Sequence, residues 1–168
     1  ETLGAVSVIC TDKTGTLTAN EMTVRRVLLA DAEVDVSGAG YAPAGGFVAD
    51  GAGFDPAGHP GFAGLARAAL LCNDADLTET GAVWTLAGDP TEGALVTLAL
   101  KTGLDAATIR RAAPRRDAIP FESEHRFMAT LNHDHAGRST IYLKGAPERV
   151  LALCVAARAT GGDVALDV

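Results

Sequence analysis

Apolar residues return at helical spacing in two stretches of the chain. Over residues 62–74 they recur every three or four positions, which predicts a helix with one buried face. Over residues 89–101 the apolar run follows "GDPTE", where Asp89 can cap the first turn and Pro90 suits the first helical position. Shorter helices are predicted in two further segments, 105–113 and 147–154.

Alternating runs and short, fully apolar runs predict strands. Residues 6–10 are apolar and largely β-branched, as expected for a strand that is buried on both faces. Residues 127–133 and 138–144 alternate, and the "DHAG" between them is a hairpin signal. Further strands are predicted over 22–30, 83–86 and 118–121. Helices mixed with antiparallel hairpins predict an α+β domain after about residue 20.

Glycine, alanine and proline crowd the segment 35–61, which predicts turns and short strands in an excursion on the surface. A flexible linker between two domains is the alternative. Three aromatic residues weigh against a fully solvated linker: Tyr41, Phe47 and Phe54.

Composition narrows the class of protein. A chain of 168 residues, 48% of them apolar, can form one domain, or one domain and a piece of another. The net charge of −7 argues against a nucleic-acid partner, because an acidic surface repels phosphate backbones. A single nucleotide is not excluded, since one small phosphate site needs only local positive charge.

Cysteine usage and hydropathy place the chain in a reducing compartment without a membrane span of its own. Cys10, Cys72 and Cys154 are odd in number and widely spaced in apolar surroundings, which favours buried thiols over disulfides. No apolar run approaches the roughly 18 residues that cross a bilayer. Because the chain starts at Glu1 without Met, we expect it to be a fragment of a longer protein.

The predicted strand over residues 6–10 ends on a carboxylate, Asp12. Small residues follow it, Thr14-Gly15-Thr16, and their turn can present backbone N–H groups to a phosphate. A carboxylate at the end of a strand can attack phosphorus and form an aspartyl-phosphate. Alternatively, Asp12 only caps the next turn, and the spacing alone does not decide between the two.

Three more short segments, here called patches and centred on Glu92, Phe121 and Lys144, each allow either a structural or a functional interpretation. Glu92 stands three residues after Asp89, so it can complete a capping box. Phe121 ends a strand, where it can stack on a purine or simply belong to the core. Lys144 ends another strand before Gly145, whose missing side chain lets a ligand approach the backbone; a lone lysine in this position is more often only solvated.

The run "DKTGTLT" over residues 12–18 resembles the phosphorylation signature of the P-type cation-transporting ATPases, which belong to the haloacid dehalogenase-like superfamily. The resemblance implies that Asp12 accepts the γ-phosphoryl group of ATP, with Mg²⁺ held by the Asp12 carboxylate and the Thr14 carbonyl. Many phosphatases of this superfamily carry a general acid where Thr14 stands. Thr14 therefore counts against the rival hypothesis, a haloacid dehalogenase-like phosphatase with a cap domain.

The three patches resemble the nucleotide-binding motifs of the same family. "GDPTEGAL" implies that Glu92 lies near the adenine amino group, and "PFESEHRFMATL" implies that Phe121 stacks on the base. Many members have Lys where Arg126 stands, and Arg126 would add positive charge near the phosphates. "KGAPE" implies that Lys144 lines the ATP pocket. Met128 is expected in the same pocket or in the core beneath it.

The resemblance implies two domain pieces: residues 1–20 from the haloacid dehalogenase-like α/β phosphorylation domain and residues 21–168 from the nucleotide-binding domain, an antiparallel sheet flanked by helices. "SGAGYAPAGGF" and "CND" resemble the calcium-transporting subclass and its bacterial relatives.

The expected parent is an integral membrane protein, in a bacterial plasma membrane, with this chain on the cytoplasmic side. Its expected partners are the remaining phosphorylation, actuator and transmembrane domains and a transported cation, for which Ca²⁺ is the candidate. Later motifs of the family are missing, so the fragment is expected to bind ATP without turnover. A non-catalytic interaction module is a further alternative.

Overall fold

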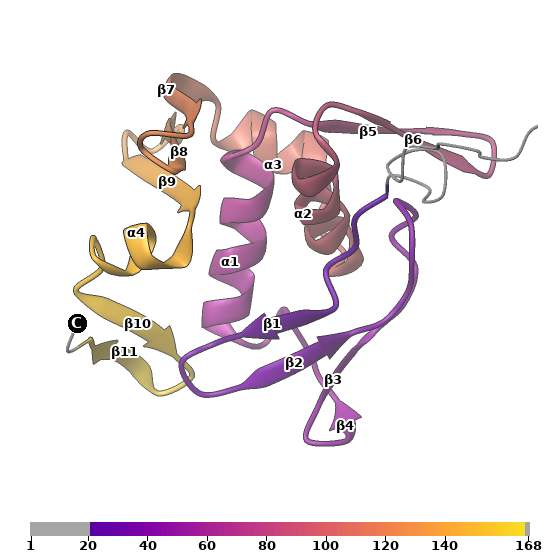
Figure 1. Cartoon of the computed structure of the whole chain (residues 1–168), viewed down its shortest axis with the longest axis horizontal. Helices are drawn as coiled ribbons and strands as arrows, with labels where there is room; N and C mark the ends of the chain where they lie inside the picture. Colours follow the sequence, from indigo (N-terminus) through magenta and orange to yellow (C-terminus); the bar gives the residue numbers. More distant parts are fainter. Residues whose placement is uncertain (1–20, 167–168) are drawn as a thin grey trace, which may run out of the picture.

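A computed structural model describes residues 21–166 of the chain. The predicted strand over residues 6–10 and the Asp12 loop lie outside the described residues. The helices are α1 (Pro60–Leu71), α2 (Pro90–Lys101), α3 (Ala106–Ala112) and α4 (Pro147–Leu151). All paired strands are antiparallel, and the α+β class expected from the sequence is confirmed (Figure 1).

The strands form several small sheets rather than one. The first sheet is a meander of β1 (Arg26–Leu28), β2 (Glu33–Val36), β3 (Phe47–Ala49) and β4 (Ala52–Gly53). The second sheet consists of β7 (Arg115–Glu122), β8 (Phe127–His133) and β9 (Ser139–Gly145). Two hairpins complete the set: β5 (Asp76–Thr80) with β6 (Val83–Ala87), and β10 (Ala156–Ala159) with β11 (Gly162–Ala165).

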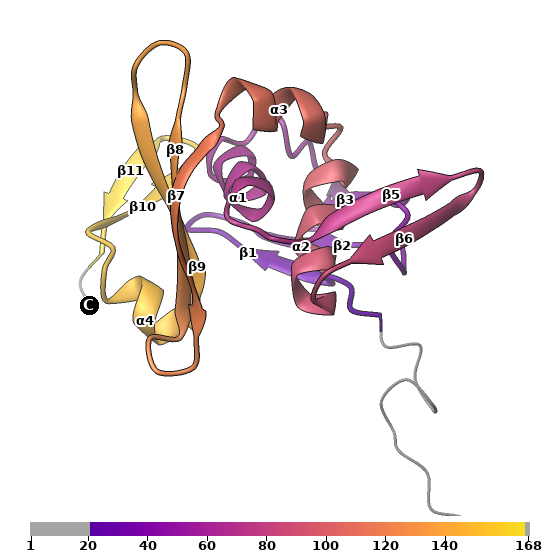
Figure 2. The same ribbon diagram turned by 90° about the horizontal axis from the view of Figure 1, so that it is seen from above.

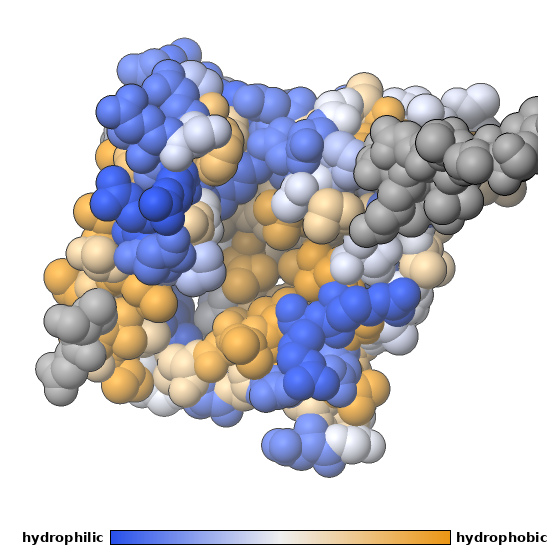
Figure 3. Space-filling model, viewed as in Figure 1, coloured by the Kyte–Doolittle hydropathy of each residue, from blue (hydrophilic) through white to orange (hydrophobic). Residues whose placement is uncertain are grey.

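The core lies where α1 and α2 pack together and against the first sheet. Phe62 and Leu70 of α1, Val34 of β2 and Leu98 of α2 are almost completely buried. In Figure 2 the β7–β8–β9 sheet is seen with α1 on one side and α4 on the other. Four apolar side chains stay exposed in and around α4 and the β10–β11 hairpin: Leu151, Leu153, Val155 and Val164. Hydrophobic surface is visible on this side of the molecule, on the left of Figure 3. The core is thus concentrated around α1 and α2.

The segment 35–61 is part of the domain, so the linker alternative is wrong. β2 and β3 pair within it, Tyr41 and Phe47 are buried, and Phe54 packs against the core. The ring of Phe47 meets that of Phe62 edge to face, with the centroids 5.1 Å apart. Aromatic burial is what holds this glycine-rich segment onto α1.

Local signals account for the starts of α2 and α3 and for the predicted hairpin. The Asp89 carboxylate caps α2 and the Asp105 carboxylate caps α3. In the β8–β9 turn, the Asp134 carboxylate accepts hydrogen bonds from the N–H groups of Ala136 and Arg138, both at 2.9 Å. Some predicted boundaries were wrong: α4 ends at Leu151 rather than 154, and the strand expected over 22–30 pairs only at Arg26–Leu28.

A long-range polar contact joins the start of the described chain to its end. His59, the N-terminal cap of α1, lies 3.0 Å from the Asp31 carboxylate through Nε2, and its Nδ1 accepts the Phe62 N–H. The other Asp31 oxygen accepts the N–H of Thr160 at 2.7 Å. That backbone hydrogen bond is the main cause that lowers the pKa of Asp31.

None of the helices in residues 21–166 is long and apolar enough to span a membrane.

Candidate functional site

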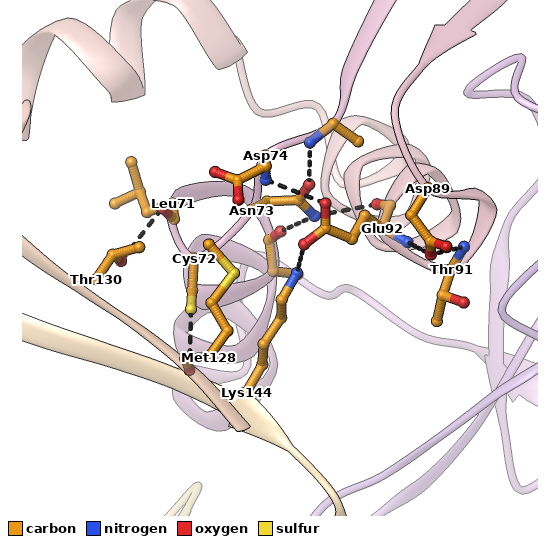
Figure 4. A network of polar contacts seen from close by, with 12 residues as sticks. Leu71, Cys72, Asn73, Asp74, Asp89, Thr91, Glu92, Met128, Thr130 and Lys144 are labelled. Carbon is orange, nitrogen blue, oxygen red and sulfur yellow. Dashed lines mark hydrogen bonds and ion pairs between the residues drawn. The ribbon is translucent and has the colours of Figure 1, made fainter. Parts of the chain in front are cut away.

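Glu92 and Lys144, which are 52 residues apart in the chain, form an ion pair (Figure 4). Glu92 lies in the first turn of α2, and Lys144 lies near the end of β9. The two side chains are only 18% and 20% exposed. A partly buried ion pair interacts more strongly than one in open solvent, because water screens it less. The structure therefore brings together two residues that the sequence predicts to bind nucleotide.

The turn after α1 holds Glu92 in place. The side-chain amide of Asn73 donates hydrogen bonds to the carbonyl oxygens of Glu92 and Ala69, both at 3.0 Å. The N–H of Asp74 donates to the second carboxylate oxygen of Glu92 at 3.3 Å. One oxygen of Glu92 thus contacts Lys144 while the other contacts the backbone of this turn.

The capping-box interpretation is correct for Asp89 and wrong for Glu92. Asp89 Oδ1 accepts the N–H of Thr91 at 2.8 Å and that of Glu92 at 3.3 Å. Burial raises the pKa of Asp89, but these hydrogen bonds outweigh it and leave the pKa below its usual range. The Glu92 carboxylate points instead to Lys144 and Asp74. It is therefore available for a role other than capping the helix.

Met128 forms the floor beneath the ion pair. It pairs with Lys144 across β8 and β9, so both side chains lie on the face of the sheet that packs toward α1. Met128 is 1% exposed, which places it in the core. The thiol of Cys72 donates to the Met128 carbonyl oxygen at 3.4 Å, and burial raises the pKa of this thiol. Lys144 and Glu92 thus meet over an apolar base.

Gly145 has a structural reason to lack a side chain. It pairs with Phe127, and a Cβ at this position would lie 2.3 Å from the carbonyl oxygen of Arg126. The same Cβ would lie 2.7 Å from the Cα of Phe127. The close approach of β8 and β9 requires glycine here, whether or not a ligand also comes near.

Replacing Gly145 by alanine is expected to destabilise the fold. The new methyl group meets backbone atoms that cannot move aside, so the free energy of unfolding should fall by about 1–3 kcal/mol. Thermal unfolding followed by circular dichroism measures this change. Gly53→Ala is the matched control, since a Cβ there meets nothing within 4 Å. Equal melting temperatures for the two variants would contradict the steric argument.

Phe121 lies near the end of β7, and Arg126 lies in the turn between β7 and β8. Phe121 is 59% exposed, so the interpretation of Phe121 as a core residue is wrong. Arg126 is exposed, forms an ion pair with Glu148 at 2.9 Å, and has a positive φ of 57°. Its N–H and carbonyl are both used, by Glu122 and Ala146 respectively, which explains how the turn sustains this backbone conformation.

The predicted nucleophile and metal ligands, Asp12 and Thr14, lie outside the described residues. Within residues 21–166, no group of three or more His, Cys, Asp or Glu side chains could hold a metal ion. A cavity of about 390 Å³ lies on the other side of the Asn73–Asp74 turn, lined by residues that include Arg110, Arg115 and Asn132. Its lining does not include Glu92, Phe121 or Lys144.

Sequence reasoning missed Asn73 and Arg115. Asn73 is 4% exposed and its amide bridges α1, α2 and the start of β5. The available signal was a polar residue directly after an apolar helix, within "CND". Arg115 carried no signal, because it belongs to a run of charged residues and only the fold determines which groups its side chain contacts.

Comparison with known proteins identifies the family of this chain. Residues 61–168 match the family model described as P-type ATPase, cytoplasmic domain N. The chain is 45% identical over 159 residues to the cation-transporting ATPase pma1 of Synechocystis sp., covering 92% of this chain and 17% of that protein. It is 43% identical to the probable cation-transporting ATPase F of Mycobacterium tuberculosis, with the same coverage. It is 38% identical over 170 residues to the human calcium-transporting ATPase type 2C member 1, covering 99% of this chain and 18% of that protein.

The chain thus spans less than a fifth of the length of these relatives. The matched segment contains α1 except its first residue, the ion pair and the whole β7–β8–β9 sheet. The chain belongs to the P-type ATPase family, and its residues 61–168 correspond to that family's cytoplasmic domain N.

Proposed function

We propose that this chain is the ATP-binding part of a P-type cation-transporting ATPase. The observation that carries the proposal is the meeting of Glu92 and Lys144, from distant elements, in a partly buried position above Met128. Residues 1–20 are assigned to the phosphorylation domain and residues 21–168 to the nucleotide-binding domain. The names of the relatives support cation transport, with Ca²⁺ as the candidate ion.

Each side chain of the site suits one part of an adenine nucleotide. The Glu92 carboxylate can accept hydrogen bonds from the amino group of adenine. The exposed ring of Phe121 can stack on the base, and Lys144 and Arg126 supply positive charge. Because Glu92 and Lys144 pair with each other, a nucleotide must exchange these contacts for its own. We therefore expect the isolated chain to bind ATP weakly, since it also lacks the phosphate contacts of other domains.

In the intact protein we assign the covalent step to Asp12. Its carboxylate oxygen attacks the terminal phosphorus of ATP, the bond to the ADP oxygen breaks, and an aspartyl-phosphate forms. Asp12 and Thr14 are the residues that would hold Mg²⁺, which supplies neutralisation of charge on the phosphoryl group. Hydrolysis would drive transport through the actuator and transmembrane domains of the same protein. The assigned location is the cytoplasmic side of a membrane, a bacterial plasma membrane in our proposal.

A titration of the isotope-labelled chain with ATP tests nucleotide binding. We expect amide chemical shifts to change around Glu92, Phe121 and Lys144 at millimolar ATP, without release of phosphate. The β10–β11 hairpin serves as an internal control, because it lies outside the site. No shifts at these three residues would overturn the proposal. Shifts confined to Arg110 and Arg115 would instead place the nucleotide in the neighbouring cavity and would also contradict it.

A further inference from the structure

The turn that holds Glu92 is itself held from its far side by one guanidinium group. Arg115, at the start of β7, donates through Nη1 to the Asp74 carboxylate at 2.6 Å and through Nη2 to the Asn73 carbonyl oxygen at 2.5 Å. These two residues of the turn also donate to Glu92: the Asn73 side-chain amide to its carbonyl oxygen and the Asp74 N–H to its carboxylate. Arg115 itself lines the cavity of about 390 Å³ and does not contact Glu92 or Lys144 directly.

We propose that Arg115 is a positioning residue for nucleotide binding, which acts through the Asn73–Asp74 turn on Glu92. This inference rests on the proposed function and adds to it a residue outside the binding site. The fork of the guanidinium fixes a carbonyl and a carboxylate at once, so it sets the orientation of the turn as well as its position. The Asp74 N–H then points at one Glu92 oxygen and leaves the other for Lys144.

An ion pair at a protein surface usually contributes little to stability, so a mere surface contact is the alternative to weigh. Arg115 differs from such a contact because its side chain is only 33% exposed and because it binds a backbone carbonyl as well as a carboxylate. Arg110 also binds one carboxylate and one backbone carbonyl, but those of the next two residues in the chain, the Asp76 carboxylate and the Ala75 carbonyl oxygen. Arg110 therefore provides a control of matched chemistry that does not bind Asn73 or Asp74.

The experiment measures ATP affinity for Arg115→Ala and Arg110→Ala, each alone and combined with Glu92→Ala. We expect Arg115→Ala to weaken ATP binding by about tenfold, the order of one lost hydrogen bond to a charged group. Arg110→Ala should change it by less than twofold. In the Glu92→Ala background, Arg115→Ala should have no further effect, because the residue through which it acts is gone.

A second readout needs no nucleotide. The Asp74 amide should exchange its hydrogen faster in Arg115→Ala than in Arg110→Ala, because the turn is no longer oriented toward Glu92. An ATP affinity that falls equally in both backgrounds, or equally for both arginines, would overturn the proposal, as would unchanged exchange at Asp74. If the wild-type chain bound no ATP, the proposed function would fail, while the exchange rates would still decide whether Arg115 positions the turn. If Arg115→Ala did not fold, Arg115→Lys, which keeps the charge without the fork, would replace it in both measurements.

Discussion

Replacing Asp12 by asparagine in the intact protein is expected to abolish the transfer of labelled phosphate from ATP to the protein. The amide nitrogen and oxygen of asparagine cannot form the acyl phosphate that the carboxylate forms, so the covalent step is lost rather than slowed. The measurement is acid precipitation after a short incubation with γ-labelled ATP. In the wild-type protein the label should be released by hydroxylamine, as an acyl phosphate is.

A matched control and a contrary outcome complete this test. Asp50→Asn makes the same chemical change in the turn between β3 and β4, far from the predicted nucleophile in sequence, and should keep the label. A wild-type label that resists hydroxylamine, or a label that survives Asp12→Asn, would remove Asp12 as the acceptor. Rapid release of phosphate from simple phosphate esters would instead favour the phosphatase alternative.

Replacing Phe121 by alanine is expected to weaken ATP binding by about 1–3 kcal/mol, which is roughly 5- to 150-fold in the dissociation constant. A stacked ring loses its contact with the base, while the fold loses little, because the ring is already 59% exposed. Calorimetric titration measures the affinity, and thermal unfolding of the same variant shows whether the fold is intact.

Ile119→Ala is the control for Phe121→Ala. Ile119 lies on the same strand and is 51% exposed, so its loss removes a comparable exposed apolar group without removing an aromatic ring. The affinity of this variant should stay close to that of the wild type. An unchanged affinity in Phe121→Ala, or an equal loss in both variants, would show that Phe121 does not stack on the base.

Local sequence signals predicted much of the framework of the described residues. The apolar period of α1, the proline and aspartate that start α2, and the β8–β9 turn each depend on neighbours within a few residues. Interactions of this range are encoded where they occur, so they can be read without the fold. Short strands such as β5 and β10 were missed because their pairing partners, rather than their own residues, make them strands.

By itself the sequence determined the helices, the Asp89 cap of α2, the β8–β9 hairpin and, through "DKTGTLT" and "KGAPE", the family. Only the tertiary structure decided that the Glu92 carboxylate turns away from the helix cap to Lys144, and that Arg115 binds the Asn73–Asp74 turn beside Glu92. The physical reason is that these contacts join residues from 18 to 52 positions apart. Their geometry depends on how α1, α2 and the β7–β8–β9 sheet pack, which no local pattern specifies.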